Sequence, residues 1–151
     1  MIFKDKYREF QELAREHDFL RKHNMGIPKD DQSRLLLFAE GALIIIMLER
    51  FLRILPGLQA KDTETLGPLL KRVVDQKILV ISLQDREDML HIRNTILHGN
   101  FEQAAKQAKV SSKEEYFKTQ YVPKIERFYS FLDQLVDQID PETGLRKTSQ
   151  P

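Results

Sequence analysis

Three side chains capable of phosphate chemistry lie within six residues of one another, in the stretch IRNTILHGNF at 92–101. An arginine such as Arg93 can hold two phosphate oxygens at once. A histidine such as His98 can take or give a proton near neutral pH. Asn94 can orient an imidazole or donate a hydrogen bond to a phosphate. These residue types predict chemistry on a phosphodiester.

The motif closes a predicted helix that begins near Ser82 and ends at Gly99. The letters SLQD at its start form a capping box, and glycine commonly follows the last helical residue. On an ideal helix Arg93 falls on the apolar side, whereas Asn94 and His98 share the far side, about 140° from Arg93. The residues predicted for the apolar side are Met89, Leu90, Ile92, Ile96 and Leu97.

A guanidinium on an apolar side needs an acidic partner, because an unpaired buried charge is costly. Glu40 is the candidate, since it lies among Leu36, Leu43 and Met47 on its own helix. We therefore expect Glu40 to pair with Arg93. In the alternative, Arg93 extends from the edge of the core to solvent, and Glu40 lines a wet groove. In an alternative role, the imidazole of His98 donates to the last carbonyls of its helix and caps it.

Other catalytic chemistries lack their residues. The chain has no cysteine, and none of its glycines forms a phosphate-binding loop or a nucleophile elbow. His91 and His98 are two turns apart, about 10 Å along a helix, which is too far for one metal ion. We expect neither a metal nor another cofactor.

The bulk properties are those of a globular protein: 151 residues, 41% hydrophobic, 31% charged and a net charge of +1. So small a net charge means that any RNA binding must come from a local patch. The most apolar stretch, 35–48, is broken by Glu40 and is shorter than the roughly 20 residues that span a bilayer. We expect a cytoplasmic protein without a membrane span.

Apolar residues recur every three or four positions through most of the chain, which predicts an all-α bundle of about five helices. We expect a single domain over 1–140 and a frayed, flexible tail over 141–151. Pro123 should kink or break the last helix. The expected helices cover 2–23, 31–55, 65–79 (capped by Thr65), 82–99, a short one at 101–109, and a last segment from a capping box at Ser111 to Ile139.

The series Arg93-Asn94-x-x-x-His98, followed by Gly99, resembles the R-x(4–6)-H signature of the HEPN superfamily. These are small all-α domains, many of them metal-independent ribonucleases. The resemblance extends over roughly residues 2–139 and includes a Thr-Leu-Gly start to the third helix. It implies an RNA endonuclease, as a toxin or other defence component, in which Arg93, Asn94 and His98 act on the RNA. The products would be 2′,3′-cyclic phosphate and 5′-hydroxyl ends.

The resemblance also implies partners. Two motifs would meet in a cleft between the subunits of a homodimer, and a regulatory partner protein is a further expectation. Asn100 stands where HEPN toxins silenced by adenylylation have a tyrosine, so we do not expect that regulation. The main rival is a non-catalytic HEPN-like module that binds a nucleotide or a protein. A purely structural helical adaptor is a third alternative.

The second predicted helix offers a surface for such a dimer. One face of this helix is polar near the C-terminal end, but the same face carries a stripe of apolar residues in the first half. The first half of the helix is therefore apolar nearly all round. Either this is a central helix covered on every side, or the stripe is a partner surface with alanines allowing close approach. The resemblance favours the partner surface. The stripe consists of Leu35, Ala39, Ala42 and Ile46.

Overall fold

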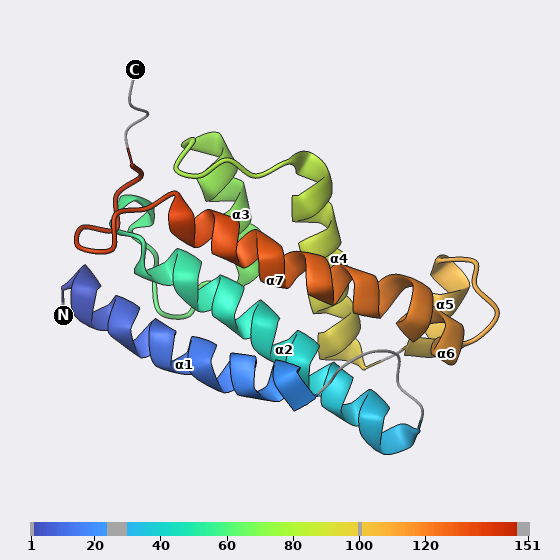
Figure 1. Ribbon diagram of the computed structural model, residues 1–151. Coiled ribbons are helices and arrows are strands. Elements are labelled where there is room, and N and C mark those ends of the chain that lie inside the picture. Colours follow the sequence, from blue (N-terminus) through green and yellow to red (C-terminus); the bar gives the residue numbers. More distant parts are fainter. Residues whose placement is uncertain (1, 24–29, 100, 148–151) are drawn as a thin grey trace.

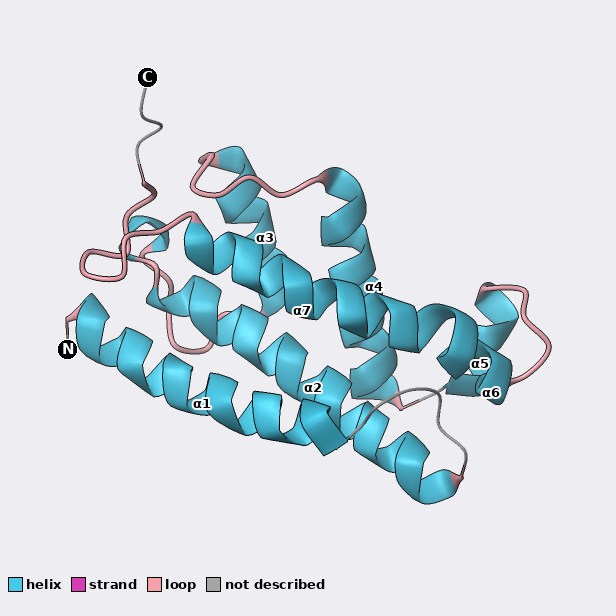
Figure 2. Ribbon diagram, viewed as in Figure 1, coloured by secondary structure: helices cyan, strands magenta, loops and turns pink. Residues whose placement is uncertain are grey.

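The prediction of an all-α fold is confirmed (Figures 1 and 2). The computed structural model describes residues 2–23, 30–99 and 101–147, and these ranges contain helices and one isolated β-bridge but no β-strand. The elements are α1 (Phe3–His23), α2 (Asp31–Ile54), a 3-10 turn (Pro56–Leu58), α3 (Leu66–Asp75), α4 (Leu83–His98), α5 (Phe101–Gln107), α6 (Lys113–Tyr116), a π-helical segment (Phe117–Tyr121) and α7 (Val122–Asp137).

Helix α2 is the centre of the bundle. It contacts α1, α3, α4 and α7, and Figure 1 shows it between α1 and α7 with α3 and α4 behind. None of the described helices is long and apolar enough to cross a membrane. Because α2 contacts four other helices, it lies at the centre of the hydrophobic core. Its largest fully buried side chains include Ile44, Leu48, Phe51, Leu52, Leu69, Leu70, Met89, Tyr116, Tyr121 and Phe128.

The ends of α4 follow from local sequence signals. The Ser82 hydroxyl accepts a hydrogen bond from the backbone N–H of Asp85 at 3.1 Å, and Gly99 closes the helix with a φ of 62°. Thr65 stands at the N-cap of α3, but its side chain makes no cap. The first N–H of α3, that of Leu66, donates instead to Glu49 of α2 at 2.7 Å. A long-range contact thus replaces the predicted local one.

The last helical segment differs from its prediction. The capping hydroxyl belongs to Ser112, which accepts from the N–H of Glu115 at 3.1 Å, and not to Ser111. Pro123 does not break the helix, because it lies in the first turn of α7 and the turns before it are π-helical. The π-helical turns change the hydrogen-bond register just before Pro123, which lets the helix continue past a residue without an N–H.

The segment after α7 is folded back and not frayed, up to residue 147. The backbone N–H of Asp140 donates to the backbone carbonyl of Leu145 at 2.8 Å, and the backbone N–H of Gly144 donates to the backbone carbonyl of Asp140 at 2.7 Å. Gly144 is buried against the ring of Phe3 at the start of α1. Backbone hydrogen bonds thus fold 141–147 back toward the end of α7, and the last four residues of the predicted tail lie outside the described ranges. Asn100 lies outside the described ranges as well.

Gly41→Ala should strongly destabilise the protein. A β-carbon at position 41 would lie 1.9 Å from the hydroxyl oxygen of Tyr121, which is fully buried and donates to the carbonyl of Phe38 at 3.1 Å. The ring has no free space to move into. We expect the free energy of unfolding to fall by about 3 kcal/mol, which urea denaturation would measure.

Gly67→Ala is the matched control, because its new β-carbon would meet only Leu90, at an ordinary 3.6 Å. It should leave stability unchanged or raise it by up to about 1 kcal/mol through the helix propensity of alanine. Equal stabilities for Gly41→Ala and the wild type would contradict the packing described here.

Candidate functional site

A polar pocket of about 540 Å³ lies between α4 and α5. His91, Asn94 and His98 face it from α4, because their spacing of three and four places them on one side of a helix. Gln103 and Gln107 face it from α5. Asn94 and His98, both predicted site residues, are thus brought together. The pocket offers imidazoles and amides to a polar ligand, with the proton-transfer capacity of the two histidines.

His91 is a site residue that the sequence reasoning missed. Its spacing from Asn94 and His98 places it on their face of the helix, but the sequence singles it out only as a possible metal ligand. Burial lowers the pKa of its imidazole, and the nearby Lys124 lowers it further, while Asp88 acts in the opposite direction. The ring is therefore largely neutral at pH 7, which is the form that accepts a proton.

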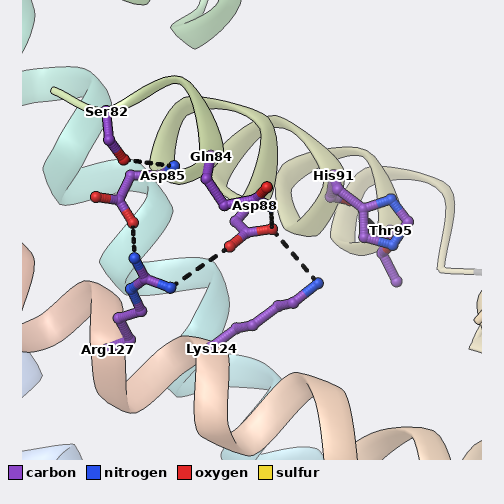
Figure 3. A network of polar contacts seen from close by, with 8 residues as sticks. All are labelled: Ser82, Gln84, Asp85, Asp88, His91, Thr95, Lys124 and Arg127. Carbon is purple, nitrogen blue, oxygen red and sulfur yellow. Dashed lines mark hydrogen bonds and ion pairs between the residues drawn. The ribbon is translucent and has the colours of Figure 1, made fainter.

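Ion pairs hold α4 against α7 and so position His91 (Figure 3). Arg127 of α7 forms an ion pair with Asp85, and its guanidinium nitrogen lies 3.9 Å from a carboxylate oxygen of Asp88. The ammonium nitrogen of Lys124 lies 3.8 Å from the other carboxylate oxygen of Asp88. Gln84 also donates to Asp88, at 3.0 Å. The network anchors the first half of α4, and in the second half Ile92 and Thr95 are buried.

Arg93 does not line the pocket. It is half-buried on another side of α4, in agreement with the predicted angular offset from His98. Its guanidinium donates to the side-chain oxygen of Asn94 at 3.4 Å, a long and weak hydrogen bond. Among the described residues, no carboxylate lies within ion-pair distance of it. Arg93 is therefore a cation available to an external anion.

Glu40 does not pair with Arg93, so that prediction is wrong. The side chain of Glu40 is only 1% exposed, and its charge acts on Arg21 of α1 and on Tyr121, next to α7. Burial raises the pKa of the Tyr121 hydroxyl, and the neighbouring Tyr116 and Glu40 raise it further. Glu40 thus points to the side of α2 that faces α1 and α7, away from Arg93.

The predicted stripe on α2 is uncovered. Leu35 is 68% exposed, Ile46 is 42% exposed, Ala39 is exposed and Ala42 is half-buried. Although α2 contacts four helices, it is not covered on every side, so that alternative fails for the single chain. Leu97 of α4 is 63% exposed as well, contrary to its predicted place in the core. Exposed apolar side chains gathered on one element are typical of an interaction surface.

Within the described residues, no three histidine or acidic side chains are grouped so that they could hold a metal ion. Comparisons with models of protein families, with curated proteins and with solved structures found no match.

Proposed function

We propose that this protein is a metal-independent RNA endonuclease whose active site is completed by homodimerisation. The observation that carries the proposal is the pocket between α4 and α5, in which His91 and His98 flank Asn94. The guanidinium of Arg93 lies outside this pocket and has no ion pair within the part of the chain that the structure describes. Two imidazoles and a guanidinium can supply the base, the acid and the charge stabilisation for cleavage beside a 2′-hydroxyl. The resemblance to HEPN ribonucleases supports the same assignment, and a role as a toxin or defence component would be consistent with it.

The reaction needs two proton transfers. His91, neutral at pH 7, takes the proton of the 2′-hydroxyl, and the resulting oxygen attacks the adjacent phosphorus. His98 gives a proton to the departing 5′ oxygen as the phosphorus–oxygen bond breaks. Asn94, between the two histidines, holds the scissile phosphate or orients His98. The products are a 2′,3′-cyclic phosphate and a 5′-hydroxyl.

Charge on the phosphorane oxygens has to be stabilised, and this is the role of Arg93. Arg93 and His98 of one chain lie on different sides of α4, so a second chain supplies the missing group. The exposed residues of the stripe on α2 support this arrangement, because they offer a surface on which a second copy could pack. Each cleft then contains Arg93 of one subunit and His98 of the other.

The direct test is an assay of the purified protein against a mixture of cellular RNAs, with analysis of the new ends. Cyclic phosphate and 5′-hydroxyl ends that are absent with the His98→Ala variant would support the proposal. RNA or nucleotide binding without cleavage would favour the rival, a non-catalytic HEPN-like module.

Cleavage should persist in excess EDTA. Proton transfer by imidazole and charge stabilisation by guanidinium need no metal ion, so the rate with EDTA should nearly equal the rate without it. The measurement is a time course on one fluorescently labelled RNA. Loss of activity that Mg²⁺ or Mn²⁺ restores would overturn the mechanism.

A further inference from the structure

A second cavity, of about 290 Å³, lies between α1 and α7. Both helices pack against α2, whose Met47 contributes to the cavity lining (Figure 1). The walls include the aromatic rings of Tyr7 and Phe10 from α1 and of Tyr129 from α7. So small a cavity with aromatic walls suits a compact ligand that has an apolar body.

His17 lines this cavity and is an unsatisfied polar group. Its side chain is fully buried, and within the described residues neither ring nitrogen has a hydrogen-bond partner. Burial lowers the pKa of His17, so the ring stays neutral and offers one donor and one acceptor. Buried polar groups are rarely left without a partner. A ligand that reaches His17 after a small shift of the stacked Tyr129 ring, 5.3 Å away, would satisfy it.

The cavity wall carries two acids, Asp18 and Asp133, and one cation, Arg15, whose guanidinium lies 4.0 Å from the carboxylate of Glu12. Asp18 is paired with Lys22 at 3.3 Å. Asp133 lines the cavity together with Asp18, and among the described residues it has no ion pair. Burial raises the pKa of Asp133, and repulsion from Asp137 raises it further. Arg21 attracts Asp133 only from a distance, because its guanidinium is paired with Glu126 at 2.7 Å. An acid in this setting favours a cationic ligand.

We propose that the cavity binds a small primary amine with an apolar body. The ammonium group lies between Asp133 and His17, donating to the carboxylate and to the free imidazole nitrogen. The apolar body lies among Tyr7, Phe10 and Tyr129. A quaternary ammonium has no N–H for His17, and an anion is repelled by the carboxylates, so neither should bind well. This site is independent of the proposed RNA cleavage.

Phenethylamine is the probe, titrated into the full chain by isothermal calorimetry and by NMR of the histidine ring signals. We expect saturable binding at one site and a shift of the His17 signals. The neutral analogue 2-phenylethanol and the anion 3-phenylpropionate have the same body without the ammonium, and both should bind at least roughly tenfold more weakly. Equal binding of phenethylamine and 2-phenylethanol would overturn the assignment of a cation site, as would no binding of phenethylamine.

Variants locate the site. Asp133→Asn should weaken phenethylamine binding by roughly tenfold, whereas Asp75→Asn, an exposed acid on α3, should leave it unchanged. His17→Phe keeps a ring against Tyr129 but removes the nitrogens, and it should weaken binding in the same way. If Asp133→Asn and Asp75→Asn have the same effect, the binding reflects overall charge and the proposal is wrong. Because Asp133 is exposed, its variant should fold even if His17→Phe does not.

Discussion

His98→Ala is expected to lower the rate of RNA cleavage by roughly 10²- to 10⁴-fold, the usual contribution of a positioned acid or base. The imidazole is exposed at the last residue of α4, so its removal should leave the core unchanged. Single-turnover rates at saturating protein would report the chemical step, and thermal unfolding followed by circular dichroism would report the fold. A variant that cleaves like the wild type would show that His98 is not catalytic.

His98→Gln separates proton transfer from helix capping. Glutamine can still donate a hydrogen bond to the last carbonyls of α4, but it cannot exchange a proton near neutral pH. We expect it to be as inactive as the alanine variant. Recovery of activity with glutamine would assign His98 a structural role at the helix end.

The double substitution Ala42→Arg with Ile46→Asp is expected to give a folded monomer without cleavage activity. Both residues belong to the uncovered stripe on α2, where charges should oppose a second copy but cost the single chain little. Sedimentation should give about twice the monomer mass for the wild type at micromolar concentration and the monomer mass for the variant. Val80→Asp, which adds charge at an exposed apolar residue away from the stripe, is the control and should remain dimeric and active.

Mixing two inactive variants tests the shared site directly. Arg93→Ala and His98→Ala each lack one of the required groups, but a mixed dimer contains one cleft with both. We therefore expect a measurable part of the activity to return after the two proteins are mixed and allowed to exchange subunits. A wild type that sediments as a monomer yet cleaves RNA would defeat the shared site. A double variant on α2 that merely unfolds would instead assign the stripe to the fold of the single chain.

The prediction of helices succeeded where the signal was local. Ser82 and Gly99 bound α4 as expected, because a cap requires only residues within one turn of each other. Thr65 shows the limit of such reasoning. Its place before α3 was right, but Glu49 from α2 satisfies the N–H of Leu66, and no local pattern announces a partner that far along the chain.

In the candidate site, too, the features that depend on local helix geometry were predicted, and those that depend on contacts with other helices were not. Ideal helix geometry placed Asn94 and His98 on one side of α4 and Arg93 on another, and the pocket has that arrangement. The assignment of Leu97 to the core failed, because an apolar side of a helix is buried only where another element covers it. The same spacing places His91 on the side of Asn94 and His98. The pKa of its imidazole, however, is lowered by burial and by Lys124 of α7, which are features of the tertiary structure.

The sequence by itself determined the helical class, the ends of α4 and the angular separation of Arg93 from His98, since these depend on neighbours within a few turns. Only the tertiary structure decided that Glu40 faces α1 and α7 and not Arg93, and that the stripe on α2 stays uncovered. The same holds for His17, which is buried beside a cavity without a hydrogen-bond partner among the described residues. Each of these outcomes depends on which helix lies against which, and residues far apart in the chain settle that jointly when the core packs.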